Sequence, residues 1–267
     1  MAEEFYGGID FSGAREPLAN LWTAVGRERD GKLEIVSLRP HAFRADLAGF
    51  VSGGWREAIG AEEGEAVLWG ADFACGLPAG AARHLLGDGC RWEALLAWVA
   101  DRPADEVRDA VPAELREPRR ADRGGPTAPF DNRNYRQTVE GLRWLHELRE
   151  EHAAVVAPHE PPEGPCRLIE VSPQATTVDL GLPRRRSPSR PGEVRARAAA
   201  LRTFLTFAHP ETEALAVTLE DAWDAVLCGL TAWMVRDDLD QPFRTGGGDA
   251  ESIALEGWIY RPPAALE

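Results

Sequence analysis

The chain has 267 residues, of which 44% are hydrophobic, and it carries a formal net charge of −14 at pH 7. This length and hydrophobic content suffice for a buried core in one large domain or two small ones, which excludes general disorder. The acidic balance argues against a surface coated with basic residues for tight nucleic-acid binding, but it leaves room for a local basic groove or an acidic metal site.

Localisation is predicted from what the sequence lacks. No apolar run approaches the roughly 20 residues that cross a bilayer, and the acidic start MAEEFYGG has no basic, signal-like segment. The four cysteines are scattered without a C-x-x-C pair, which is typical of a reducing compartment. We therefore expect a cytoplasmic protein with no membrane partner.

Three predicted strands open the chain. The stretch 5–14, FYGGIDFSGA, runs through apolar and small residues to Asp10 and then turns at Ser12, which is typical of a buried strand. The stretches 20–26 and 32–38 also read as strands, and the turn between them contains Asp-Gly, a strong hairpin signal. An antiparallel start to a sheet follows.

The middle of the chain mixes one further strand with helices. Residues 44–59 predict a helix that its glycines weaken, and 65–72, EAVLWGAD, predicts a second buried strand that ends at Asp72. A helix is expected over 91–100. Residues 102–152 are interpreted as an inserted lid or helical segment that ends in a clearly amphipathic helix, YRQTVEGLRWLHELREEH.

The remaining elements complete an α/β order. Short strands are expected over 155–157 and 166–171, the latter with Glu170 near its end, and a helix is expected over 193–207. Strands that alternate with helices, after initial hairpins, predict an α/β fold with a mixed sheet.

The last part of the chain has the strongest helix signal, over 218–236. Thr218 suits the N-cap and acidic residues follow it in the first turns. One more strand is predicted over 253–260.

Four aspartates form the leading candidate for a chemical site. Asp10 and Asp72 each end an apolar strand, and parallel neighbouring strands would bring those ends to one edge of the sheet. Asp221 and Asp224 are three residues apart, on one helix face among apolar neighbours. Asp221 has an alternative structural role as a helix-dipole partner three residues after Thr218. Clustered carboxylates without histidine or cysteine favour Mg²⁺ or Mn²⁺.

Several motifs together resemble a known family. In order they are GIDFSGA, WGADFACGLP, LIEVSPQAT, EDAWDAVLCGLTAW and EGWIY, and they extend over nearly the whole chain. They resemble the predicted RNase H-like nuclease family, also called domain of unknown function 429. The resemblance implies a single RNase H-like domain over 1–267, with a central mixed sheet of about five strands flanked by helices.

The same resemblance implies roles for individual residues. Asp10 would lie on the first, central strand and Asp72 at the end of the fourth. The pair Asp221 and Asp224 resembles the last-helix acids of Holliday-junction resolvases. Glu170 would be either close to the metal or a positioning residue.

Substrate contacts are expected from polar and basic residues near these elements. The basic loop RRRSPSRP and the cluster NRNYR, at the start of the helix 135–152, are the candidates for binding phosphate. The individual residues are Ser12, Arg133, Tyr135, Arg184, Arg185, Arg186 and Arg190. The alternatives are a solvated arginine-rich loop for RRRSPSRP and a lid or capping role for NRNYR.

The sequence therefore predicts a divalent-metal-dependent phosphodiester hydrolase, a nuclease that uses Mg²⁺ or Mn²⁺ in a two-metal mechanism on a nucleic acid or nucleotide. Asp10, Asp72, Glu170, Asp221 and Asp224 are the candidate catalytic residues, and the four aspartates are the candidate metal ligands. Two alternatives stay open, because fold does not fix function. One is a small-molecule phosphotransferase of the actin/hexokinase-like type, and the other is a non-catalytic binding protein with the same fold.

Overall fold

The computed structural model describes residues 4–13, 20–122, 128–131, 134–183, 190–245 and 250–263. Over these residues the strands form one mixed sheet of eight strands in the order β5-β6-β4-β1-β2-β3-β7, with β8 paired to β6. The strands are β1 (Glu4–Asp10), β2 (Leu21–Arg29), β3 (Lys32–His41), β4 (Ala66–Ala71), β5 (Val155–Ala157), β6 (Cys166–Val171), β7 (Leu205–Phe207) and β8 (Ile259–Tyr260).

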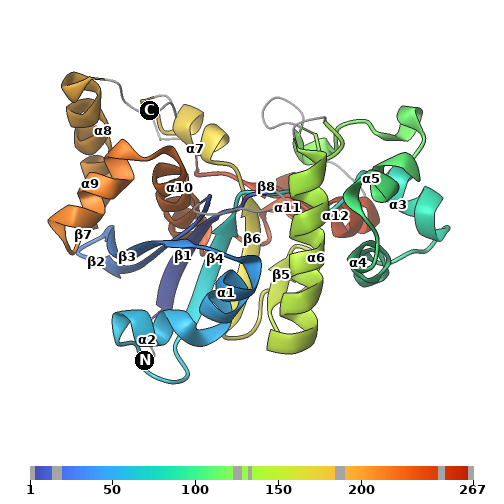
Figure 1. Cartoon of the computed structure of the whole chain (residues 1–267), viewed down its shortest axis with the longest axis horizontal. Helices are drawn as coiled ribbons and strands as arrows, with labels where there is room; N and C mark the ends of the chain where they lie inside the picture. The colour runs from blue at the N-terminus through green and yellow to red at the C-terminus, as the bar shows by residue number, and fades with distance from the viewer. Residues whose placement is uncertain are drawn as a thin grey trace.

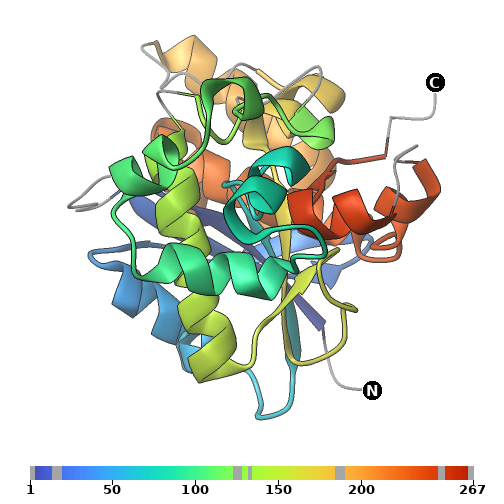
Figure 2. The ribbon, with the colours of Figure 1, turned by 90° about the vertical axis from the view of Figure 1, so that its right-hand side faces the viewer.

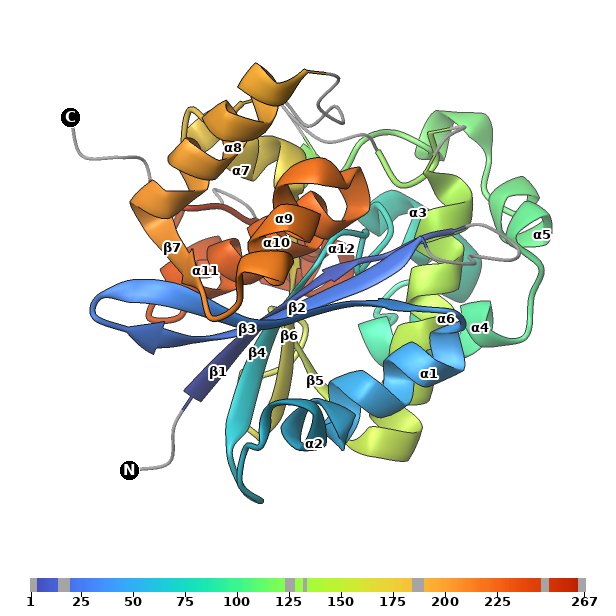
Figure 3. The same cartoon turned by 60° about the vertical axis from the view of Figure 1, so that its left-hand side comes forward.

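Helices cover both faces of the sheet (Figures 1 and 3). One face packs against α1, α2 and α6, with α4 packed on α6, and the other packs against α8, α9 and α10. The helical segments are α1 (Arg44–Gly49), η1 (Phe50–Gly54), α2 (Trp55–Ile59), α3 (Ala79–Leu86), α4 (Trp92–Ala100), α5 (Ala104–Asp109), η2 (Ala113–Leu115), η3 (Arg120–Asp122), α6 (Tyr135–His152), α7 (Pro173–Asp179), α8 (Pro191–Phe204), α9 (Pro210–Thr218), α10 (Glu220–Val235), α11 (Gln241–Thr245) and α12 (Ala250–Glu256).

The antiparallel start of the sheet follows from its hairpin. Asp30 and Gly31 have φ angles of 53° and 74°, and two successive positive φ angles are what a two-residue hairpin turn of type I′ requires. The strands β1, β2 and β3 pair antiparallel, whereas β4 pairs parallel to β1. The predicted hairpin and the mixed sheet are confirmed.

The predicted sheet of about five strands is too small. The strands beyond these five are short. β5, which matches the strand expected over 155–157, and β7, which was not predicted, have three residues each, and β8 has two. A segment of this length shows no recognisable alternation of polar and apolar residues. Its strand character comes from a neighbouring backbone, as when β7 pairs with residues 33–35 of β3.

Two predicted helices have the wrong limits. The helix predicted over 193–207 ends at Phe204, because the next three residues pair with β3 and bury Leu205. Thr218 is not the N-cap of the helix that follows. It is the last residue of α9, its hydroxyl donates to the carbonyl of Ala214 at 2.6 Å, and α10 begins after Leu219.

Two further segments differ in kind from the prediction. Residues 44–59 form α1, the π-helical turn η1 and α2 in succession, and the two adjacent glycines of this stretch fall in η1. Residues 253–260, predicted as a strand, belong first to α12 and only at the end to β8. Gly257, with a φ of 78°, separates the two elements.

Segment 102–152 ends in α6, which has its predicted bounds. This helix places Val139, Leu142 and Leu145 in the core on one face of the sheet. In Figure 2, α4 crosses in front of α6, and α12 lies beside α3. Within the described part of the chain, the helices fall short of the length and apolar character needed to span a membrane.

Candidate metal centre

Asp10 and Asp72 lie side by side on one face of the sheet. The parallel strands β1 and β4 are paired so that Ile9 faces Ala71, and the amide of Asp72 continues the ladder by donating to the carbonyl of Ile9 at 3.0 Å. Side chains alternate between the faces of a strand, and Ile9 and Ala71 belong to the core on the α6 side. The two aspartates therefore face α10.

Two glycines allow α10 to approach these strand ends closely. A Cβ atom on Gly8 would lie 1.9 Å from the carbonyl oxygen of Ala225, and one on Gly70 would lie 2.4 Å from that of Cys228. Only glycine leaves room for the helix backbone at both positions. As a result, Asp224, in the second turn of α10, is fully buried beside the ends of β1 and β4.

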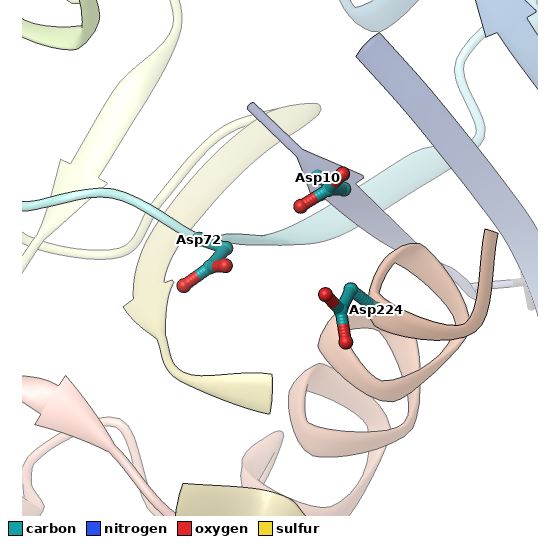
Figure 4. A group of neighbouring side chains, drawn as sticks. All are labelled: Asp10, Asp72 and Asp224. Carbon is teal, nitrogen blue, oxygen red and sulfur yellow. The ribbon is translucent and has the colours of Figure 1, made fainter. Parts of the chain in front are cut away.

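These three aspartates form one cluster. Asp10, Asp72 and Asp224 each offer a carboxylate oxygen, and the three oxygens lie within 4.8 Å of one another. Figure 4 shows the side chains converging from the end of β1, from the residue after β4 and from α10. Asp10 and Asp224 are buried and Asp72 is half-buried.

The chemistry of this cluster fits a divalent cation. Three carboxylates held so close repel one another, and a cation between them would offset that repulsion. The donors are all oxygens, which Mg²⁺ and Mn²⁺ prefer, and their spacing is compatible with shared ligation, since Mg²⁺ binds oxygen at about 2.0–2.1 Å. The described residues thus bring together three of the four predicted metal ligands.

The Gly8 contact leads to a prediction. Replacement of Gly8 by alanine is expected to lower the free energy of unfolding by about 3 kcal/mol or more, because the added methyl group meets backbone atoms of α10 that cannot rotate away. Gly49→Ala is the matched control: Gly49 is helical and has open space around it, so alanine there should be neutral or stabilising by up to about 1 kcal/mol. Urea denaturation measures both, and a Gly8→Ala variant as stable as wild type would contradict the packing described.

Glu170 does not join the cluster, because it lies on the other face of the sheet. It pairs with Ala71 in the parallel ladder of β4 and β6, and Leu168, on the same face of β6, belongs to the core on the α6 side. Its carboxylate forms a bidentate ion pair with Arg119, at 2.7 and 2.5 Å, and accepts the amide of Cys75 at 2.8 Å.

Arg119 is the centre of a fully buried network. Its guanidinium also binds Asp122 at 2.8 Å and the carbonyl of Glu256 at 2.9 Å. Burial opposes the charge on Arg119, but Glu170 and Asp122 outweigh it, so the pKa of the guanidinium is raised. Burial also raises the pKa of Glu170, although Arg119 opposes that shift. The network joins the segment before α6 to β6, α12 and the loop that follows Asp72.

A second buried arginine lies close to the cluster. The guanidinium of Arg197, on α8, lies 4.6 Å from the centre of the Trp223 ring. Burial lowers its pKa, and Asp224 is the main charge that opposes this shift. Arg197 is thus a positive charge near the fully buried member of the cluster.

The other predicted site residues are not members of the cluster of three, or they are outside the described residues. Asp221 is half-buried on α10 and is not among the three clustered carboxylates of the described chain. The Ser12 carbonyl accepts a hydrogen bond from Arg44 at 3.0 Å, and the Tyr135 hydroxyl donates to Asp105 at 2.7 Å. Arg190 is exposed immediately before α8. Arg133, Arg184, Arg185 and Arg186 lie outside the described residues.

The sequence did not indicate Arg119 or Gln137, whose hydrogen bonds fix the chain segments around the cluster. Gln137 lies on α6, and its amide donates to the carbonyl oxygens of Phe11 and Asp72. Gln137 resembles any polar residue on an amphipathic helix, and Arg119 is one of many arginines in a polar, proline-rich stretch. Neither has a local signal that would single it out.

The fold and the cluster define a mixed α/β protein with a buried carboxylate site suited to a divalent cation. The model of the family described as "Protein of unknown function (DUF429)" matches residues 8–244, and the chain belongs to this family. Neither a curated protein nor a solved structure matches the chain.

Proposed function

We propose that the chain is a divalent-metal-dependent phosphodiester hydrolase, a nuclease of RNase H-like fold. The observation that carries this proposal is the convergence of Asp10, Asp72 and Asp224, with carboxylate oxygens within 4.8 Å of one another at the ends of two parallel strands. Acidic oxygen sites of this kind bind Mg²⁺ or Mn²⁺ together with substrate phosphates.

The topology supports the RNase H-like part of the proposal. The family resemblance implies that Asp10 lies on a central first strand and Asp72 at the end of the fourth. In the sheet, β1 has β2 and β3 on one side, paired antiparallel, and β4 and β6 on the other, paired parallel. Asp10 ends that central strand, and Asp72 directly follows β4.

Each carboxylate of the proposed site comes from a different part of the fold. Asp10, from the end of β1, Asp72, from the residue after β4, and Asp224, from α10, would hold the cation with their carboxylate oxygens. A bound divalent ion supplies Lewis-acid stabilisation of the phosphoryl oxygens and lowers the pKa of bound water. The buried position of Asp10 and Asp224 restricts water around the ligands and strengthens their electrostatic interactions.

A small cavity borders Asp72 on the Glu170 side of the sheet. The cavity bordering Asp72 has a volume of about 50 Å³ and is lined by Arg119, Gln137, Glu170 and Ser172, among others. This is far below the roughly 300 Å³ of an ordinary small-molecule pocket, so it suits a few water molecules. Asp10 and Asp224 do not line this cavity, so it does not set the size of the substrate at the cluster.

The test is hydrolysis by the purified chain. Single-stranded DNA, duplex DNA, RNA and a dinucleotide are each incubated under three conditions. These are Mn²⁺ or Mg²⁺ alone, the metal with EDTA, and the metal with ATP. We expect cleavage of at least one substrate that needs the metal, is abolished by EDTA and is indifferent to ATP. Product formed only with ATP would identify a phosphotransferase instead. Mn²⁺ binding without cleavage of any substrate would identify a binding protein.

A further inference from the structure

Gln137 connects the ends of both acidic strands. It lies in the first turn of α6, and its side-chain nitrogen donates to the carbonyl oxygen of Phe11 at 2.7 Å and to that of Asp72 at 2.6 Å. Phe11 directly follows Asp10. Gln137 therefore binds the backbone of the residue after Asp10 and the backbone of Asp72 itself. One amide group thus uses both of its hydrogens to hold the two strand ends at a fixed separation.

The two strand ends need such a connection. The ladder between β1 and β4 reaches the amide of Asp72, which donates to Ile9, and Gln137 engages the carbonyl groups just beyond that point. There the carboxylates of Asp10 and Asp72 repel each other in the absence of a cation. An amide is uncharged, so it resists their separation without competing with a cation for the carboxylates, as a lysine or arginine would.

The rest of α6 holds the same two chain segments. A Cβ on Gly13 would lie 2.4 Å from the Cα of Gln137, so the turn after β1 packs directly on the helix backbone. The rings of Phe11 and Phe73 lie 4.7 Å apart, and Trp144 of α6 packs against both, at 5.5 and 6.0 Å between ring centres. Phe11 and Phe73 are the residues that follow Asp10 and Asp72. The helix therefore gives Gln137 a rigid base.

We propose that Gln137 is a positioning residue for the metal centre, which sets the separation of the Asp10 and Asp72 carboxylates for cation binding. This inference rests on the proposed function, because it assigns to Gln137 an effect on the cation that the cluster would bind. Residues that orient metal ligands typically change metal affinity by about 10–100-fold when they are replaced.

The test compares Mn²⁺ affinity in three forms of the full chain by isothermal titration calorimetry. Gln137→Met keeps the length and volume of the side chain but removes both donors, and we expect its Kd for Mn²⁺ to rise about 10–100-fold. Val139→Ala is the control: Val139 is buried on the same helix, in its core face. This variant should melt at a lower temperature than wild type in EDTA while its Kd for Mn²⁺ stays unchanged.

The outcomes separate the two proposals. If Gln137→Met binds Mn²⁺ as tightly as wild type, or if Val139→Ala loses as much affinity, Gln137 does not position the ligands. If wild type itself binds no Mn²⁺, the proposed function fails and this role of Gln137 falls with it. Should Gln137→Met not fold, Gln137→Asn replaces it, since its shorter amide cannot reach both carbonyls, and the same rise in Kd is expected.

Discussion

Replacement of Asp10 by asparagine is expected to lower Mn²⁺-dependent phosphodiester hydrolysis by about 10³-fold or more, since a bound metal contributes several kcal/mol of transition-state stabilisation. The same change removes one of three mutually repelling carboxylates, so the variant should melt in EDTA at the wild-type temperature or above it. Added Mn²⁺ should raise the melting temperature of wild type and not that of the variant. Loss of activity together with stabilisation in EDTA would distinguish a metal ligand from a structural residue.

Two further variants define the limits of the cluster. Asp109→Asn changes an exposed aspartate, paired with Arg108 at 3.1 Å, and should leave activity unchanged. Asp221→Asn tests the wider ligand set predicted from the sequence, and we expect an activity loss of less than about tenfold, because Asp221 is outside the cluster of three in the described structure. An Asp10→Asn variant with full Mn²⁺-dependent activity would refute the proposed mechanism.

Replacement of Arg119 by methionine is expected to lower the free energy of unfolding by about 3–5 kcal/mol, because it leaves Glu170 and Asp122 buried without their common cation. A loss of this size is a large share of the 5–15 kcal/mol typical of a whole domain. Arg136→Met is the matched control, since its ion pair with Asp105 is half-exposed and should contribute about 1 kcal/mol or less. Urea denaturation of the three proteins measures the difference.

The Arg119 variant should also respond to pH in a defined direction. Burial already raises the pKa of Glu170 above its usual value of 4.5 in the folded chain, and removal of Arg119 raises it further. A carboxyl whose pKa is raised by folding holds its proton in the folded state at pH values where the unfolded chain has released it, so stability falls as pH rises. The deficit relative to wild type should therefore be larger at pH 8 than at pH 5.5. Equal deficits at both pH values, or a loss below about 1 kcal/mol, would contradict the network described.

The strand ends could be predicted from the sequence because their signals are local. An apolar run closed by a turn marks the end of β1 at Asp10 and places the end of β4 at Asp72, one residue beyond its last residue, Ala71, and helix periodicity gives α6 its full extent. The meeting of Asp10 and Asp72 followed from one further assumption, that their strands are parallel neighbours, which the sheet confirms.

The remaining features depend on contacts between distant segments. Glu170 is the second-last residue of β6, and Asp72 directly follows β4. The register of β6 against β4 places Glu170 on the opposite face of the sheet, and no local pattern encodes that register. Whether Asp221 or Asp224 faces the strand ends is decided by how α10 packs on Gly8 and Gly70. Gln137 acquires its role only when α6 is placed against both strand ends.

Contacts with neighbouring elements also explain why the sequence did not predict β7 or the last residue of α9. Residues 205–207 continue a helical pattern, yet they form a strand because β3 offers an unfilled edge beside them. Thr218 has the residue type of an N-cap, but α9, which begins at Pro210, already includes it as its last residue. In both cases a neighbouring element overrides a weak local preference.

The most direct measurement is X-ray diffraction from crystals soaked in Mn²⁺, recorded at a wavelength where manganese scatters anomalously. We expect anomalous density within coordination distance of the Asp10, Asp72 and Asp224 carboxylates, and its loss from crystals of Asp10→Asn. Absence of density at this cluster in wild-type crystals at millimolar Mn²⁺, or density bound only by other residues, would contradict the proposed metal site.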